Sequence, residues 1–335
     1  AHRPDRGPAR VHGLTVPGPR PPQPATPAAD AFDVHHALVR HGLELAFVDE
    51  GEGYPLLLLH GYPETKRIWW RNIEPLAAAG YQVVVPDLRG HGDSDVDPED
   101  RYDVVEYSRD VHALMSEHLG HDRYGIIAGD VGAAVAYDQS LRFAGAVQRM
   151  IWFNTAPPIL PEQYEEAGID IRGQGFGDPD RRPETDYQHR QGNDPDGLAA
   201  ELDTPARRRR YIADFYGHRL WASRGSFTAE DIDFMTEPWG EEDRLRAGWA
   251  VYQLMSGVRS SAEVPRLLET NPTPTLVLYG PDDQVVPSSF VECCEVAFTQ
   301  RVGPLVVPRA GHFLQWERAD VLNPLAVNWF ADLRG

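Results

Sequence analysis

The sequence alternates short, mostly apolar segments with segments of helical spacing, and this alternation restricts the fold more than any other feature. Three mostly apolar runs of strand length lie at 55–59, 81–85 and 124–128, with Gln82 as the one polar side chain among them. Segments of helical spacing follow them at 67–79, 107–119 and 132–142. Strands that are apolar throughout are typical of sheets buried on both faces. The alternation therefore predicts an α/β fold, with a mostly parallel sheet covered by helices on both sides.

Further strands are expected on either side of this central pattern. Segments 32–39 and 43–48 predict a hairpin that turns at Arg40-His41-Gly42. Later strands are expected at 150–154, 274–279 and 305–307.

The strand rhythm disappears between the sixth and seventh of these strands. Residues 157–257 instead contain helical segments at 207–216 and 242–255, which predicts a helical cap inserted between strands. Residues 1–30 are rich in proline and lack apolar periodicity, so we expect an extended arm. The core is then expected to consist of residues 31–156 and 258–335.

The charge balance disfavours some classes of partner. The formal net charge is 32 − 51 = −19, which opposes binding to nucleic acid or to an anionic membrane. No stretch approaches the ~18 consecutive apolar residues of a membrane helix, so no integral membrane segment is expected.

Two features bear on the cellular compartment, and they leave it open. The two cysteines, Cys293 and Cys294, are adjacent, which disfavours a disulfide between them. Free thiols favour a reducing compartment, so the cytoplasm is the favoured location. The first residue, Ala1, is not methionine, and a secreted protein whose signal has been removed is the alternative.

The segment Ala128-Gly129-Asp130-Val131-Gly132 is the first sign of chemistry. A buried strand ends here, a helix begins, and small residues flank a central carboxylate. This is the pattern of a nucleophile elbow, a sharp turn that lifts one side chain above the sheet. The structural alternative is an aspartate that caps the start of a helix.

A carboxylate and a histidine follow Asp130 at the ends of later strands. Asp283 lies in a turn after the strand at 274–279, and His312 lies in the loop after the last strand. Nucleophile, acid and histidine is the chain order of an α/β-hydrolase triad. We expect His312 to face Asp130, with Asp283 fixing its tautomer. Asp282 is the alternative acid.

The turn His60-Gly61-Tyr62-Pro63 follows the strand at 55–59, where this fold supplies one donor of its oxyanion hole. The expected donors are the backbone amides of Tyr62 and Val131. His60, Gly61 and Pro63 are expected to shape the turn, with a candidate cis bond between Tyr62 and Pro63.

With these motifs in place, the chain from about 43 to 330 resembles the epoxide hydrolases of the α/β-hydrolase superfamily. Residues 60–64 resemble the HGxPE turn of these enzymes, and residues 86–94 resemble their DxxGxGxS loop. Asn154-Thr155 and Gly311-His312-Phe313 also match. The resemblance implies the α/β-hydrolase fold with a helical cap and an aspartate nucleophile.

The resemblance also implies two tyrosines in the cap. Asp186-Tyr187-Gln188 is similar to the segment that bears the first epoxide-binding tyrosine, and Tyr252 falls where the second belongs. The two phenols would grip the epoxide oxygen. Ring opening needs an acid near that oxygen, and a phenol with a pKa of about 10 can donate a hydrogen bond and then a proton.

The chain departs from the family pattern on either side of the nucleophile. Epoxide hydrolases usually carry a histidine before it and a bulky residue after it, whereas this chain has Gly129 and Val131. The smaller residues leave more room beside Asp130, which suggests a bulky, oxygenated epoxide such as a secondary metabolite.

The predicted activity is hydrolysis of an ether bond, in which an epoxide becomes a vicinal diol through an ester on Asp130 and a water activated by His312. A haloalkane or haloacid dehalogenase would share this ester, but its halide needs N–H donors that Val131 does not supply. A ligand-binding receptor on the same scaffold is the second alternative. The expected partners are a small epoxide and water, and a homodimer is left open. No cysteine–histidine cluster or phosphate-binding glycine loop is present, so no cofactor and no metal are expected.

Overall fold

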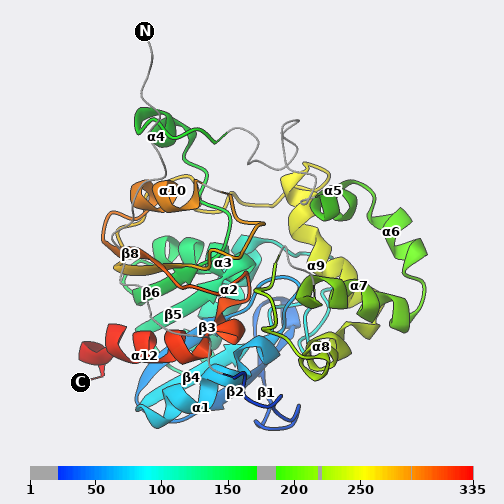
Figure 1. Cartoon of the computed structure of the whole chain (residues 1–335), viewed down its shortest axis with the longest axis horizontal. Coiled ribbons are helices and arrows are strands. Elements are labelled where there is room, and N and C mark those ends of the chain that lie inside the picture. Colours follow the sequence, from blue (N-terminus) through cyan, green and yellow to red (C-terminus); the bar gives the residue numbers. More distant parts are fainter. Residues whose placement is uncertain (1–21, 172–185, 218–220, 288, 335) are drawn as a thin grey trace.

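The computed structural model describes residues 22–171, 186–217, 221–287 and 289–334. Its centre is an eight-stranded sheet in the order β1-β2-β4-β3-β5-β6-β7-β8 (Figure 1). The strands are β1 His35–Leu38, β2 Glu44–Glu50, β3 Tyr54–Leu59, β4 Tyr81–Pro86, β5 Tyr124–Gly129, β6 Val147–Phe153, β7 Thr275–Tyr279 and β8 Arg301–Val306.

Six of these strands are parallel, as the sequence predicted. β4, β3, β5, β6, β7 and β8 pair in parallel, and β1 and β2 form an antiparallel edge. The predicted hairpin is confirmed, with His35 opposite Phe47 and a 3-10 turn at Arg40–Gly42. Because the parallel strands all run the same way, the loops that follow β3, β5, β6, β7 and β8 meet at one edge of the sheet.

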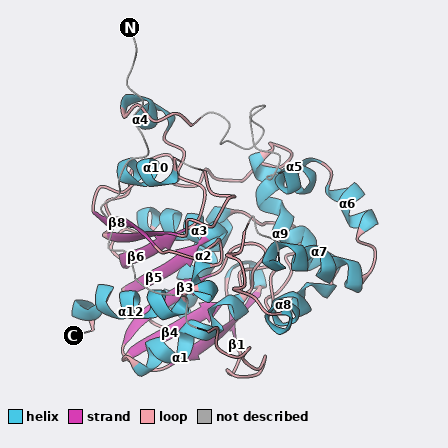
Figure 2. Cartoon of the chain, viewed as in Figure 1, coloured by secondary structure: helices cyan, strands magenta, loops and turns pink. Residues whose placement is uncertain are grey.

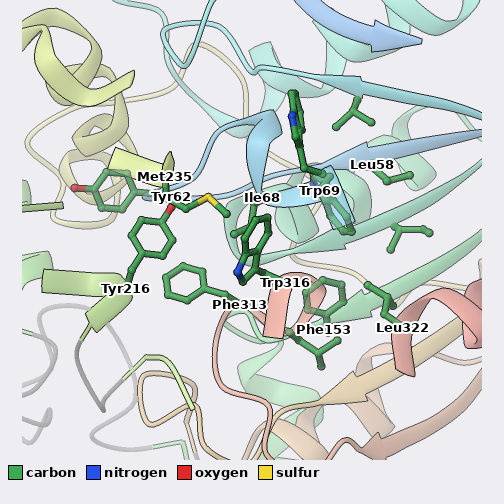
Figure 3. Packing of buried hydrophobic residues seen from close by; sticks show 14 of the residues in the cluster. Leu58, Tyr62, Ile68, Trp69, Phe153, Tyr216, Met235, Phe313, Trp316 and Leu322 are labelled. Atoms are coloured by element: carbon green, nitrogen blue, oxygen red, sulfur yellow. The ribbon is translucent and has the colours of Figure 1, made fainter. Parts of the chain in front are cut away.

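Helices cover both faces of the sheet (Figure 2). One face is covered by α1 Trp70–Ala78 and α12 Ala319–Trp329, and the other by α2 Val104–His112, α3 Asp130–Arg142 and α10 Phe290–Ala297. Figure 3 shows the aromatic centre of the first face, where Trp69 meets Phe153 edge to face with 6.3 Å between ring centroids. This cluster continues through Phe313 and Tyr216 into the inserted segment.

The chain between β6 and β7 contains only helices and loops in its described part. These helices are α4 Pro161–Glu166, α5 Asp186–Asn193, α6 Pro195–Glu201, α7 Pro205–Gly217, α8 Ala229–Thr236 and α9 Glu242–Met255. Figure 1 shows α5 to α9 gathered beside the sheet, with α5 along α9 and α7 along α8. The helix α4 packs instead on α10, and its Tyr164 lies in the core cluster of that face. Residues 172–185 of this segment lie outside the described residues.

Several predicted boundaries moved, and the reasons are local. The helix predicted at 107–119 begins at Val104, because the side chain of Asp103 accepts a hydrogen bond from the amide of Glu106 and caps it. Its last part, Ala113–His118, is π-helical. Short helical turns also occur at Lys66–Trp69, Glu237–Gly240, Leu314–Glu317 and Ala331–Leu333.

The described end of the predicted arm lies against the core. Arg71 of α1 donates hydrogen bonds to the side chain of Gln23 and to the carbonyl of Pro24. Thr26 donates to Asp231 of α8 at 2.7 Å. Residues 1–21 of the predicted arm lie outside the described residues. Among the helices of the described ranges, none is both long and apolar enough to cross a membrane.

Candidate active site

Asp130 is the first residue of α3, directly after β5, and its backbone has a φ of 47°. A positive φ is uncommon for a residue with a side chain and indicates a constrained turn. The surrounding structure holds this turn, since the amide of Asp130 donates to the carbonyl of Asn154 at 3.2 Å. The hydroxyl of Thr155 donates to the carbonyl of Asp130 at 2.7 Å. The strand, sharp turn and helix of a nucleophile elbow are all present.

Three glycines make room for this turn. A Cβ on Gly132 would lie 2.6 Å from the carbonyl oxygens of His60 and Leu59, so the helix approaches β3 more closely than a side chain would allow. A Cβ on Gly61 would lie 2.4 Å from the Cβ of Asp130. At Gly129, the ring of Phe153 occupies the space, 2.4 Å from where a Cβ would be.

The Asp130 carboxylate lies between His312 and the turn after β3. Its Oδ2 is 3.2 Å from Nε2 of His312, and its Oδ1 accepts a hydrogen bond from the amide of Tyr62 at 2.7 Å. The N-cap of α3 is Gly129 and not Asp130, so the helix-cap alternative does not describe this carboxylate. Val131 is the second residue of α3, and the amides of a first helical turn have no acceptor within the helix.

Asp283, and not Asp282, contacts the histidine. Its Oδ2 lies 2.7 Å from Nδ1 of His312, while its Oδ1 accepts hydrogen bonds from the amides of Val285 and Val286. Asp282 points elsewhere and accepts a hydrogen bond from the hydroxyl of Ser223 at 2.6 Å. The structure therefore brings Asp130, His312 and Asp283 into one line of contacts.

His312 is buried between two carboxylates. Burial alone would lower its pKa, but the charge of Asp283 and the hydrogen bonds to Asp130 and Asp283 outweigh it, so the pKa of His312 lies well above its ordinary value. A raised pKa favours the protonated form of His312 at this position.

The turn after β3 is built around His60. Its buried ring accepts a hydrogen bond from the amide of Leu88 at Nε2 and lies 2.9 Å from the carbonyl of Gly61 at Nδ1. The predicted cis bond between Tyr62 and Pro63 is confirmed. Tyr216 of α7 donates to the carbonyl of Pro63. His60, Gly61 and Pro63 therefore all lie in the turn that aims the Tyr62 amide at Asp130.

The two cap tyrosines lie together above this point. The rings of Tyr187 on α5 and Tyr252 on α9 meet edge to face with 5.7 Å between centroids. Burial raises the pKa of each phenol above its ordinary value, and the charge of Asp130 raises both further. Both hydroxyl groups are therefore within electrostatic reach of the Asp130 carboxylate. Trp221 and Gln188 also hydrogen-bond the side chain of Tyr187.

Val131 and Gly61 line a small pocket next to Asp130 with a cavity volume of about 10 Å³, the space of about one water molecule. The other lining residues are Tyr62, Leu88, His91, Tyr107, Gly248 and Val251. Burial lowers the pKa of His91 to about 3, so this wall is neutral at physiological pH.

Sequence reasoning missed three polar residues that hold the site. Glu317 accepts hydrogen bonds from the amides of Gly311 and Phe313 and so fixes both neighbours of His312. The side chain of Asn154 joins the acid loop to the histidine loop, because it accepts from the amide of Gly280 and donates to the carbonyl of Gly311.

Glu64 is the third, and it accepts a hydrogen bond from the amide of Gly61 at 2.7 Å. Burial raises its pKa to about 7. Asn154 and Glu64 fell within the matched motifs, which indicated their positions but not these contacts. Within the part of the chain that the structure describes, no cluster of three or more His, Cys, Asp or Glu side chains is arranged to hold a metal ion. Cys293 and Cys294 are buried free thiols on α10.

Comparisons with known proteins agree with this geometry. Residues 54–319 match the family described as alpha/beta hydrolase fold. A soluble epoxide hydrolase of Corynebacterium sp. (strain C12) is 38% identical over 128 residues, which are 38% of this chain and 43% of that enzyme. A haloalkane dehalogenase of Sphingobium indicum is 36% identical over 134 residues, which are 39% of this chain and 45% of that enzyme. The chain thus spans less than half the length of either curated relative.

Solved structures also match along almost the whole chain, and several of them are epoxide hydrolases. The ligand-free epoxide hydrolase CorEH has a TM-score of 0.75 and 25% identity, covering 90% of this chain and 100% of that chain. The resemblance that the motifs indicated is therefore confirmed. Because the family match covers most of the chain and the sheet carries its elbow, acid and histidine in the family order, this chain belongs to the alpha/beta hydrolase fold family.

Proposed function

We propose that this protein is an epoxide hydrolase that forms a covalent ester on Asp130. The observation that carries the proposal is the environment of the Asp130 carboxylate. It contacts His312 at 3.2 Å and the amide of Tyr62 at 2.7 Å. The Tyr62 ring meets the ring of Tyr252, which in turn meets that of Tyr187. The similarity to the Corynebacterium enzyme and to CorEH supports the same class.

In the first step, Oδ2 of Asp130 attacks an epoxide carbon while Oδ1 stays on the amide of Tyr62. The carbon–oxygen bond of the ring breaks, and its electron pair moves to the epoxide oxygen. Tyr187 and Tyr252 donate hydrogen bonds to that oxygen, and one of them gives up its proton. Although burial makes these phenols weak acids, an alkoxide is a stronger base than a phenolate, so the transfer is favourable.

Esterification then changes the histidine. Asp130 loses its negative charge when it becomes an ester, and one of the groups that raise the pKa of His312 is removed. His312 can now release its proton to the phenolate that the first step left, and it can then accept a proton from water at Nε2. Asp283 stays bonded to Nδ1 and stabilises the imidazolium that forms.

In the second step, that water attacks the carbonyl carbon of the ester. The oxygen held by Tyr62 becomes an oxyanion, and the first-turn amide of Val131 is the second donor. Collapse breaks the bond to the substrate oxygen, which takes a proton from His312 and leaves as a vicinal diol. The oxygen that leaves in the diol is the former Oδ2 of Asp130. Asp130 keeps the hydroxyl of water as a carboxylic acid, which passes its proton to His312, so that the carboxylate and the imidazolium are restored.

We further propose that residues 157–257 act as the cap that carries the substrate phenols, over a core of 31–156 and 258–335. The small side chain of Val131, next to the nucleophile, is the feature that favours a bulky, oxygenated epoxide such as a secondary metabolite.

The proposal is tested by comparing products from three substrates with a common enzyme preparation. We expect a diol from styrene oxide and no halide release from bromobutane or fluoroacetate. The Sphingobium relative keeps dehalogenation as the competing function, since it would use the same aspartate. Halide release without diol formation would contradict the proposal. If the wild type forms no product and Asp130→Asn still binds the ligand, the protein is a receptor.

A further inference from the structure

Tyr62 joins the turn beside Asp130 to the cap. Its amide donates to Asp130 at 2.7 Å, while its hydroxyl lies 2.9 Å from Nε2 of Gln191 and 3.1 Å from Nε1 of Trp249, both of which donate to it. Gln191 belongs to α5 and Trp249 to α9. One residue therefore contacts the nucleophile through its backbone and two cap helices through its side chain.

These two helices are the ones that carry Tyr187 and Tyr252. Gln191 follows Tyr187 by four residues on α5, and Trp249 precedes Tyr252 by three residues on α9. Residues three or four apart lie on the same face of a helix. A hydrogen bond at Gln191 or Trp249 therefore fixes the rotation of the helix face that carries the neighbouring phenol.

Ring contacts reinforce the same connection. The Tyr62 ring meets the Tyr252 ring edge to face with 5.6 Å between centroids, and Tyr252 meets Tyr187 in the same way at 5.7 Å. The side chains of Tyr62, Gln191 and Trp249 are buried, at 3%, 0% and 0% exposure. Loss of the Tyr62 hydroxyl would leave the buried indole of Trp249 without its acceptor and the Gln191 amide with Tyr211 as its remaining acceptor, so both helices would lose their hydrogen bond to Tyr62.

The turn itself has independent support. The amide of Gly61 is held by Glu64, and the carbonyl of Pro63 by Tyr216. Removing the Tyr62 hydroxyl should therefore leave its amide on Asp130 while it releases α5 and α9.

We propose that Tyr62 is a positioning residue for ring opening: its phenol oxygen sets where α5 and α9 hold Tyr187 and Tyr252 relative to Asp130. The inference rests on the proposed epoxide hydrolysis. Tyr62 then has two roles: its backbone amide acts in ester hydrolysis, and its hydroxyl acts in ester formation.

The test is a single-turnover comparison of wild type and Tyr62→Phe with styrene oxide, with ester formation and ester hydrolysis followed separately by rapid quench and mass spectrometry. We expect ester formation to slow by about tenfold or more, because displaced catalytic groups lose rate steeply. Ester hydrolysis should stay within about twofold. Equal rates of ester formation in the two proteins would overturn the inference. A wild type that forms no ester would instead overturn the proposed function, and the inference with it.

Tyr164→Phe is the matched control, because it removes another buried phenol hydrogen bond of the inserted segment, from Tyr164 of α4 to the carbonyl of Pro158, away from α5, α9 and the turn after β3. We expect its ester formation to stay within about twofold of wild type. If it slows as much as Tyr62→Phe, general loosening of the cap explains both results and the inference fails.

Gln191→Leu tests the same connection from the other end, and it remains informative if Tyr62→Phe does not fold. We expect Gln191→Leu alone to slow ester formation, and the double variant to be no slower than the slower single variant. Independent sites give additive effects. Additive slowing, or no slowing in Gln191→Leu, would overturn the inference.

Discussion

Replacing Gly61 by alanine would drive a methyl group into the side chain of Asp130. The added Cβ would lie 2.4 Å from both the Cβ and the Oδ1 of Asp130. Carbon atoms in contact are ordinarily about 3.5 Å apart, so one side must move by about 1 Å. A displacement of that size at a reacting group costs roughly 100-fold in rate, which is about 2.7 kcal/mol of activation free energy.

The assay is kcat/KM on styrene oxide, with thermal unfolding recorded for the same samples. Overpacking should also lower the free energy of unfolding by about 1–3 kcal/mol. Gly217→Ala is the control, since its Cβ would meet only the side chain of Ile232 at 3.7 Å. We expect near-wild-type kcat/KM in the control. A folded Gly61→Ala variant with kcat/KM within about threefold of wild type would show that the Asp130 side chain does not need the space beside Gly61, and would refute this prediction.

Four further predictions rest on the contacts of the site. Asp283→Asn should lower kcat by roughly 10³ to 10⁴-fold, because His312 loses the partner that fixes its tautomer. Asp282→Asn should change kcat only a few-fold. Equal effects of the two substitutions would contradict the assignment of Asp283 as the acid. Asp130→Asn should lower the pKa of His312 in a nuclear magnetic resonance titration, since a nearby carboxylate is removed; an unchanged pKa would contradict their pairing. The pKa of His312 is raised in the folded protein, so its protonation stabilises the fold fully below about pH 6.5. This stabilisation is lost as the pH rises through the folded pKa. The difference in unfolding free energy between wild type and Asp130→Asn should therefore shrink over that pH range. Tyr252→Phe should slow ester formation by about 10²-fold and leave ester hydrolysis nearly unchanged in single-turnover experiments; equal slowing of both steps would contradict its role as an acid.

The sequence predicted the parts of this fold that depend on local pattern. Wholly apolar runs such as 55–59 and 124–128 became buried parallel strands, and the turn at Arg40–Gly42 closed the expected hairpin. These features follow from hydrophobic periodicity and turn residues, which act over a few neighbouring positions.

The candidate site was partly predictable, because strand ends of a parallel sheet converge at one edge. That rule brought Asp130, Asp283 and His312 together, although the choice between Asp282 and Asp283 needed the structure. The positions of Tyr187 and Tyr252 came from a family resemblance and not from local pattern.

Other supporting contacts could not be predicted from sequence. Glu317 binds backbone amides of the histidine loop, and any residue type supplies such amides. The bonds from Gln191 and Trp249 to Tyr62 join segments more than 100 positions apart in the chain, so neither spacing nor composition indicates them. Contacts of this kind depend on tertiary packing alone.

The central claim is that Asp130 forms an ester which water hydrolyses at the carbonyl carbon. A single turnover with excess enzyme in heavy-oxygen water tests it directly, followed by mass spectrometry of the diol and of the peptide that contains Asp130. If the ester forms, we expect heavy oxygen in the Asp130 carboxylate and ordinary oxygen in the diol, because the product leaves with the original aspartate oxygen. Heavy oxygen found only in the diol, with none in the protein, would contradict the ester on Asp130 and indicate direct attack of water on the epoxide.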